Sequence, residues 1–220
     1  MHESISLSQL EAVRVIPAGG PAYLVAKRII DLVAALILLI FLSPAFLLVA
    51  TAIKIWTPGP AFYEWRVVGK GGRPFIGYKF RTMVTDADRL KDQLVASNEM
   101  IGPVFKMAND PRITSIGRLL RKFSIDELPQ LWSVLKGDMS LVGPRPPLQS
   151  EFERFTDWQK QKLAVKPGIT CSWQVQGRNR VSDFDRWVEM DLQYIQQRGL
   201  WHDLKILLMT GPAVLRGTGH

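Results

Sequence analysis

Two adjacent carboxylates, Asp126 and Glu127, are the residues in this sequence whose types and setting most strongly suggest chemistry. A carboxylate beside Arg121 and near a helix N-terminus should have a lowered pKa and stay ionised, so it could act as a nucleophile or hold Mg²⁺. Adjacent acids point in different directions, so one could attack while the other binds metal or moves a proton. Ser124 and Glu127 also fit the capping-box pattern, however, and the same residues could simply begin a helix.

Basic side chains with phosphate-binding character stand before and after this pair. On a predicted strand, Lys79 and Arg81 share one face. Arg145 lies between Pro144 and Pro146, which fix the local backbone and reduce the entropy lost when the guanidinium binds a ligand. The fork geometry of a guanidinium suits a diphosphate. Each cation could equally be an ordinary solvent-exposed charge. The pattern alone therefore leaves both phosphate binding and simple solvation open.

A polar group closes an extended run predicted over Ile169 to Val175. Such side chains beside a glycine could read a base or a sugar phosphate, or could simply form a polar loop. The group comprises Gln174, Gln176, Gly177, Arg178 and Arg180.

The composition limits which chemistry is available. The 220 residues include one cysteine and three histidines, at His2, His202 and His220. A disulfide framework, a cysteine-rich zinc site and a three-histidine zinc site are therefore disfavoured. The net charge of +8 indicates a polyanionic partner: nucleic acid, a phosphorylated substrate or an anionic membrane. Helix-turn-helix, zinc-finger and aromatic RNP motifs are missing from the sequence, which argues against nucleic acid.

The positive charge lies on one side of a long apolar run. Leu32 to Ile53 carry no charged side chain, and the segment before Lys54 is neutral, so the whole excess falls in 54–220. As a helix the run could span a bilayer core of roughly 30 Å. A cleaved signal peptide is disfavoured, because the run is too long and begins too late in the chain.

Ser43 and Pro44 interrupt this apolar run near its middle. Proline leaves one backbone carbonyl without its helical donor, and the Ser43 hydroxyl could supply another. The helix could kink there and span the membrane, or turn back and leave on the side it entered. Basic residues flank both ends of the run, and only the re-entrant form keeps both flanks in the cytoplasm, so the sequence favours the re-entrant helix.

The remaining elements predict an α+β fold that is mostly helical. Phe62–Val68 and Pro74–Met83 read as a β-hairpin around a glycine-rich loop. Leu200 to Met209 suits an amphipathic helix at the membrane interface or, equally, a core helix. The other predicted helices are Asp86–Ser97, Ile116–Lys122, Leu128–Leu135, Leu148–Val165 and Phe184–Gln197. The expected organisation is a flexible tail (1–21), a re-entrant membrane helix (22–55), a cytoplasmic catalytic domain (56–212) and a short tail (213–220).

Several long motifs occur in order along the chain: Tyr78-Lys-Phe-Arg-Thr-Met83, Asn109-Asp-Pro-Arg-Ile-Thr114, Ser124-Ile-Asp-Glu-Leu-Pro-Gln-Leu131, Gly137-Asp-Met-Ser-Leu-Val-Gly-Pro-Arg-Pro146, Lys166-Pro-Gly-Ile-Thr170 and Asp203-Leu-Lys-Ile206. Together they resemble the bacterial sugar transferase family, the monotopic phosphoglycosyl transferases, over roughly residues 22–212. The chain resembles the minimal catalytic form of that family. It departs from many members at Cys171, where they carry glycine.

The resemblance implies a function in glycan assembly. Family members transfer a sugar 1-phosphate from a UDP-sugar to polyprenyl (undecaprenyl) phosphate at the cytoplasmic face of the bacterial inner membrane, and Mg²⁺ is required. The motifs around Phe105-Lys-Met107 and Trp173 to Arg178 look closer to exopolysaccharide-type members, which use UDP-glucose or UDP-galactose. The resemblance also implies that the first membrane element is re-entrant and broken at Ser43-Pro44. A homodimer stays open, and the alternative function is a non-catalytic, membrane-anchored scaffold of polysaccharide assembly.

The resemblance also implies roles for individual residues. Asp126 would attack the β-phosphate, release UMP and carry a covalent phosphosugar, with Glu127 as the second member of the pair and both as metal ligands. Arg121 and Arg145 correspond to the phosphate-binding arginines of the family. The further candidates for substrate binding are Lys79, Arg81, Arg112, Gln176 and Arg178.

Overall fold

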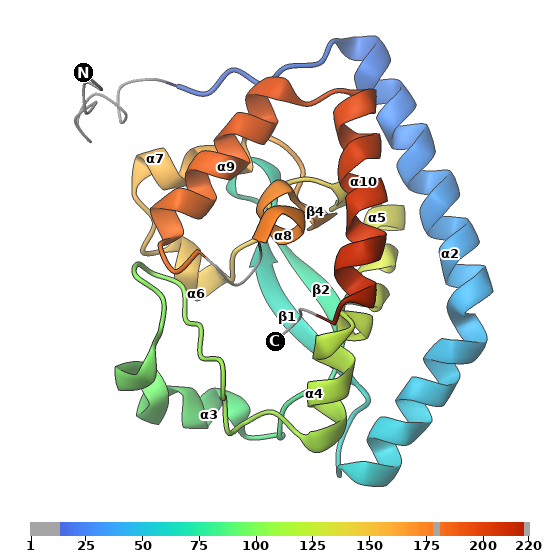
Figure 1. The fold of residues 1–220 in the computed structure, drawn as a ribbon, viewed down its shortest axis with the longest axis vertical. Helices are drawn as coiled ribbons and strands as arrows, with labels where there is room; N and C mark the ends of the chain where they lie inside the picture. The colour runs from blue at the N-terminus through green and yellow to red at the C-terminus, as the bar shows by residue number, and fades with distance from the viewer. Residues whose placement is uncertain (1–13, 178–180, 218–220) are drawn as a thin grey trace.

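A computed structural model describes residues 14–177 and 181–217 of the chain. Figure 1 shows a mostly helical molecule in which one long helix, α2, runs along the outside of the remaining elements. The strands form two small pairs, the antiparallel β1–β2 hairpin and a parallel β3–β4 pair. The predicted mixture of many helices and one small hairpin is confirmed.

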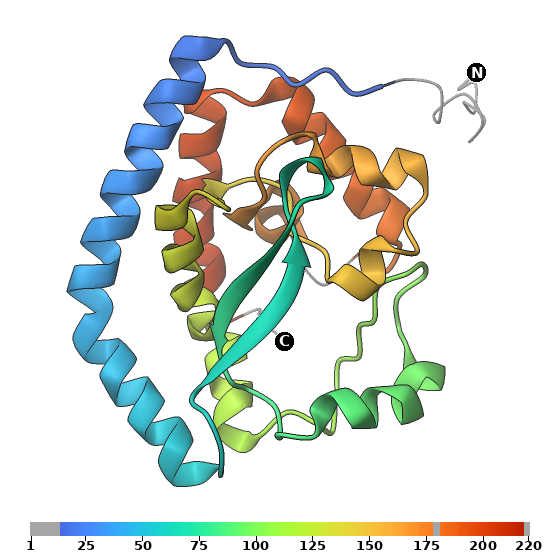
Figure 2. The same ribbon diagram turned by 180° about the vertical axis from the view of Figure 1, so that it is seen from behind.

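Helix α2 extends from Pro21 to Trp56 and contains the whole apolar run. It is long and apolar enough to cross a membrane by length and composition. Pro44 lies inside it, and the Ser43 hydroxyl donates to the Ile40 carbonyl at 2.8 Å, the carbonyl that proline leaves without a donor. This confirms the predicted role of Ser43. Figures 1 and 2 show that α2 changes direction along its length, while the choice between a kinked span and a re-entrant helix stays a prediction.

Polar contacts hold the N-terminal half of α2 to the rest of the chain. Arg28 donates to the carbonyls of Val134 and Leu135 at 2.7 and 2.9 Å, at the C-terminal end of helix α5 (Leu131–Lys136). A cation is favourable there because the last carbonyls of a helix lack intrahelical donors. The Asp31 carboxylate accepts from the Leu141 amide at 3.0 Å. The charged residues that precede the apolar run therefore fix its position.

The hairpin consists of β1 (Phe62–Val68) and β2 (Pro74–Phe80), joined by the short 3-10 helix η1 (Lys70–Gly72). Its register pairs Trp65 with Gly77. The prediction is confirmed apart from the end of the second strand, which stops at Phe80 rather than Met83. Arg81 therefore lies just beyond the strand.

Short helices connect the larger elements. In chain order the further elements are α3 (Ala87–Lys91), η2 (Asp92–Ser97), α4 (Ser115–Lys122), η3 (Ile125–Gln130), β3 (Ser140–Val142), α6 (Gln149–Phe152), α7 (Asp157–Lys160), η4 (Gln161–Ala164), β4 (Gly168–Thr170), α8 (Ser172–Gly177), α9 (Phe184–Gln197) and α10 (Leu200–Leu215). Helix α9 has the predicted bounds. Helix α10 continues to Leu215, inside the 213–220 segment predicted as a tail.

Two predicted elements are wrong. The single helix expected over Leu148–Val165 is three short pieces, because Thr156 accepts from the Gln159 amide and begins a new helix in mid-segment. The extended run expected over 169–175 ends at Thr170, and helix α8 follows it. The short β4 instead pairs with β3, a parallel contact that local pattern does not reveal.

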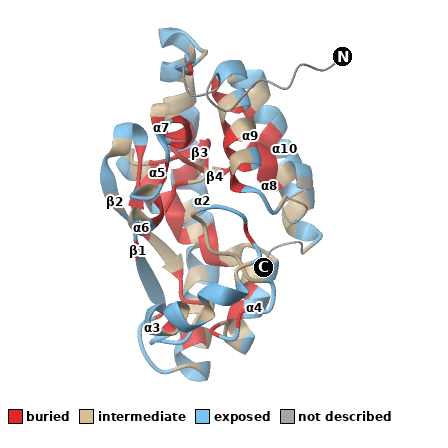
Figure 3. Cartoon of the chain, turned by 90° about the vertical axis from the view of Figure 1, so that its left-hand side faces the viewer, coloured by how far each residue is buried: buried red, intermediate tan, exposed pale blue. Residues whose placement is uncertain are grey.

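The buried residues concentrate around α5, β3, β4 and α9, as Figure 3 shows. A second cluster surrounds Trp173 and Trp187, whose rings stack at 4.2 Å. A third, containing Ile53 and Phe80, joins the C-terminal end of α2 to the hairpin. The hairpin and η3 line one cavity, together with helices α4, α8 and α9.

Candidate active site

A cavity of about 510 Å³ lies between the hairpin, η3 and the segment around Arg145. Asp126 and Glu127 line it, and both side chains are buried. They stand on η3, the 3-10 helix Ile125–Gln130, as the expected helix start requires. Ser124 adopts a left-handed conformation with φ 54°, whereas a capping serine is extended, so the predicted capping box is wrong. The tight turn at Ser124 thus precedes the two carboxylates that line the cavity.

Glu127 joins two of the predicted cations. Its Oε1 atom lies 2.8 Å from Lys79 Nζ and 3.0 Å from an Arg145 guanidinium nitrogen. Burial lowers the pKa of Lys79, although the charge of Glu127 opposes this effect. Burial alone would also lower the pKa of Arg145, but the charge and hydrogen bond of Glu127 outweigh it and raise that pKa. The structure therefore places Lys79 and Arg145 together beside the acidic pair.

Trp65 and Gly77 support this arrangement, and the sequence analysis missed both. The Lys79 ammonium lies 4.0 Å from the centre of the Trp65 ring. A Cβ atom at position 77 would lie only 2.2 Å from the Trp65 indole nitrogen, so glycine there leaves room for the ring. The signal was the hairpin register itself, which places a large aromatic residue opposite a glycine.

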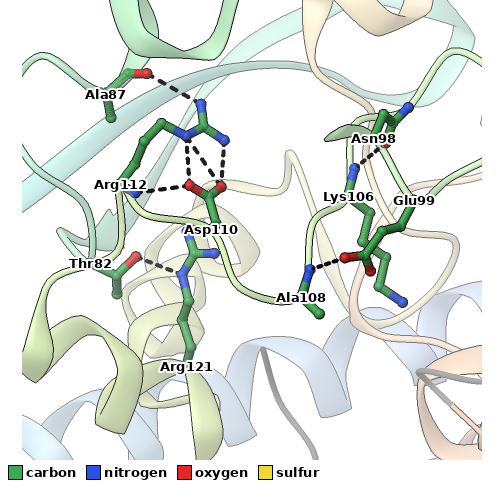
Figure 4. Close-up of polar contacts among 9 residues, drawn as sticks. All are labelled: Thr82, Ala87, Asn98, Glu99, Lys106, Ala108, Asp110, Arg112 and Arg121. Carbon is green, nitrogen blue, oxygen red and sulfur yellow. Dashed lines mark hydrogen bonds and ion pairs between the residues drawn. The ribbon is translucent and has the colours of Figure 1, made fainter. Parts of the chain in front are cut away.

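Arg121 of α4 lines the same cavity, and Figure 4 shows its side chain directed toward Thr82 and Asp110. Its Nε atom donates to the Thr82 hydroxyl at 2.9 Å, and burial lowers the pKa of its guanidinium. Nearby, Arg112 makes a two-pronged contact with Asp110, at 2.9 and 2.6 Å, and donates to the Ala87 carbonyl. Arg112 thus lines the cavity, and Asp110 and the Ala87 carbonyl hold its guanidinium in place.

The remaining predicted residues differ in their surroundings, and Arg81 also lines the cavity. Arg81 donates to the carbonyls of Thr57 and Pro58 at 2.9 and 2.6 Å, and so ties the end of α2 to the hairpin. Arg81 lies just beyond the end of β2 at Phe80, and its guanidinium binds the end of α2, whereas Lys79 binds Glu127. Gln176 is exposed on α8 and does not line the cavity. Arg178 lies outside the described residues.

The acidic pair has the ligand chemistry that Mg²⁺ prefers. The described residues contain no cluster of three or more histidine, cysteine, aspartate or glutamate side chains that could hold a metal. Mg²⁺ is commonly bound through one or two carboxylates, with water and substrate phosphates completing its shell. Asp126 and Glu127 therefore have the donor chemistry to hold a Mg²⁺ ion.

Comparison with known proteins gives consistent matches along most of the chain. A family model described as bacterial sugar transferase matches residues 22–217. The chain is 48% identical over 198 residues to the galactosyl transferase CpsE of Streptococcus agalactiae serotype III, covering 90% of this chain and 44% of that protein. It is 45% identical over 198 residues to the undecaprenyl-phosphate galactose phosphotransferase of Salmonella typhimurium, covering 88% and 41%.

A third relative is similar in length to this chain. The exopolysaccharide production protein ExoY of Sinorhizobium fredii is 41% identical over 207 residues, covering 92% of this chain and 89% of that protein. The chain thus spans less than half the length of the first two relatives and most of the third.

Proposed function

Because the chain belongs to the bacterial sugar transferase family, we propose that it transfers a sugar 1-phosphate from a UDP-sugar to polyprenyl phosphate. The observation that carries this proposal is the buried Asp126–Glu127 pair in one cavity with Lys79, Arg121 and Arg145. A diphosphate is strongly anionic, and catalysis of its transfer depends mainly on positioning and charge neutralisation. We further propose that the product is the first lipid-linked intermediate of exopolysaccharide or glycan assembly, and that the hexose is galactose or glucose.

In the first half-reaction, an Asp126 carboxylate oxygen attacks the β-phosphorus of the donor. A new phosphorus–oxygen bond forms to Asp126, the bond to the bridging oxygen breaks, and UMP leaves with that oxygen. Glu127 accepts from Lys79 and Arg145 and would hold these two cations beside the reacting phosphate. Arg121 and Arg145 would neutralise the phosphate oxygens.

In the second half-reaction, a phosphate oxygen of the polyprenyl phosphate attacks the same phosphorus. The bond to Asp126 breaks, the carboxylate is regenerated, and a polyprenyl diphosphate sugar leaves. Asp126 and Glu127 would hold Mg²⁺, which when bound supplies further neutralisation of the diphosphate charge.

We also propose that α2 holds the molecule in the bacterial inner membrane, with the catalytic residues on the cytoplasmic face. A re-entrant α2 would keep Lys27, Lys54 and the basic 54–220 region on one side, in line with the positive-inside tendency. The site would then lie at headgroup level, where the phosphate of the acceptor is found.

UMP release from a UDP-sugar in detergent or nanodiscs tests the proposal. We expect wild-type protein to release UMP and to gain the mass of one sugar phosphate in the absence of acceptor. Asp126→Asn should lose both, because an amide does not supply the attacking carboxylate. Full turnover by Asp126→Asn would contradict the mechanism. Complementation of a deletion strain by the same inactive variant would instead favour the scaffold function.

A further inference from the structure

A second hollow, the α2–hairpin groove, runs between the C-terminal half of α2 and the open end of the hairpin. Its volume is about 540 Å³. One wall is formed by Leu47, Ala50, Thr51 and Lys54, a spacing that places all four on one face of α2. Figure 2 shows this part of α2 beside the start of β1. The catalytic proposal does not use this groove.

The other wall and its base are built from aromatic and small residues. Pro60, Ala61, Phe62 and Tyr78 line the groove from the hairpin side. Phe62 stacks on Phe80 with ring centres 5.1 Å apart, and Phe80 also meets Phe46 of α2 edge to face at 5.4 Å. These ring contacts join both walls, so the groove is a fixed feature of the packing.

The groove adjoins the cavity of the acidic pair. Pro60 and Phe62 line both hollows. At its other end, the groove meets the outward apolar surface of α2, where the side chains of Leu47 and Leu48 are 69% and 73% exposed. The groove therefore lies between an exposed apolar surface and a cationic cavity.

The charges separate the roles of the two hollows. Lys54 and Glu64 contribute one charge of each sign to the α2–hairpin groove, so the groove offers no net attraction for an anion. The cavity beyond Phe62 contains Lys79, Arg121 and Arg145. An amphiphile with an apolar tail and an anionic head matches an apolar groove next to a cationic cavity. A nucleotide sugar is polar throughout and has no apolar part to place in the groove.

We propose that the α2–hairpin groove binds the first isoprenoid units of the acceptor lipid and directs its phosphate past Pro60 and Phe62 toward the acidic pair. The inference rests on the proposed function and names where its second substrate binds. The two half-reactions should therefore respond differently to changes in the groove, because UMP release needs no acceptor.

Two neighbouring leucines provide a matched test. Leu47→Trp narrows the groove, whereas Leu48→Trp makes the same change at a similarly exposed position that does not line it. We expect Leu47→Trp to keep the UMP burst. Its KM for polyprenyl phosphate should rise about tenfold, which is the lower end of the discrimination that one added or missing group gives in an apolar pocket. Leu48→Trp should resemble wild type in both measurements.

The outcomes separate the two proposals. If wild-type protein releases no UMP, the proposed function fails. If the UMP burst is normal but both tryptophan variants transfer to the lipid equally well, the groove proposal fails while the function stands.

Photolabelling of the unmodified protein covers the case in which Leu47→Trp does not fold. A polyprenyl phosphate with a diazirine near its phosphate should label residues within 47–54 and 60–64, as mapped by peptide mass spectrometry. Unlabelled polyprenyl phosphate should compete, and a phospholipid should not. Labelling elsewhere, or equal competition by phospholipid, would overturn the proposal.

Discussion

At the scale of single residues, the sequence predicted the acidic pair and the cations beside it. It did not predict the residues that hold these side chains in position. Asp126, Glu127, Lys79 and Arg145 meet in one cavity, as residue chemistry suggests. The capping-box alternative for Ser124 is wrong, because a capping box and a left-handed turn can have the same residue types. The contact of Arg81 with the end of α2 is a long-range one, which alternation along a strand does not reveal.

The Trp65–Gly77 contact yields a prediction at this scale. Gly77→Ala should move the indole away from Lys79, because the new methyl would lie 2.2 Å from the ring nitrogen. We expect kcat/KM for UMP release to fall roughly tenfold, consistent with the loss of a desolvated cation–π contact. Steady-state kinetics at saturating acceptor would measure this.

Gly211→Ala is the matched control for this change, since an added methyl there meets no atom within 4 Å. Unchanged kinetics in Gly77→Ala, with circular dichroism like that of wild type, would show that Trp65 does not position Lys79.

At the scale of elements, the sequence predicted the bounds of long helices with a sustained apolar repeat. It did not predict the bounds of short helices and strands. Helix α9 has the predicted bounds because a strong apolar repeat and a clear stop at Gly199 define it. The segment 148–165 reads as one amphipathic helix, yet the Thr156 cap divides it. The β3–β4 pair brings together two three-residue strands, which carry too few residues for a period to be read.

The Asp110–Arg112 pair gives a prediction about how a loop is fixed between elements. The pair is buried, and Arg112 also reaches the Ala87 carbonyl at the start of α3. Asp110→Asn leaves a buried guanidinium uncompensated, so we expect a loss of about 3 kcal/mol in the free energy of unfolding at neutral pH. Denaturant unfolding in detergent would measure it, with Asp157→Asn as an exposed control.

The pH dependence of this effect has a definite sign. Burial raises the pKa of Asp110, but the hydrogen bonds and charge of Arg112 outweigh this and lower it below the ordinary value. The stabilisation is therefore present above the pKa of the unfolded state and is lost as the pH falls through the lowered pKa of the folded state. The difference between wild type and Asp110→Asn should shrink under acid conditions, and a constant difference would contradict the assignment.

At the scale of the whole molecule, the surface combines an apolar face with a basic body. Helices α2 and α10 lie side by side, linked by a Lys27–Asp203 ion pair of 2.7 Å. Asp203 and Ile206 of α10 are buried, while Trp201 and Leu208 are 77% and 66% exposed. Helix α10 therefore has both an inner and an outer apolar side, which explains why its pattern fitted a core helix and an interfacial helix equally well.

The exposed apolar sides of α2 and α10 predict which side chains contact a bilayer. If α10 lies in the membrane interface beside α2, Trp201 should contact lipid, because aromatic side chains favour that depth. In nanodiscs with brominated acyl chains, wild-type tryptophan emission should be partly quenched, and Trp201→Phe should lose a large share of the quenchable signal. Trp173→Phe should lose only unquenched emission, because Trp173 is buried in the second core cluster. Equal quenching changes in both variants would place α10 away from the lipid and leave α2 as the only contact that this face supports.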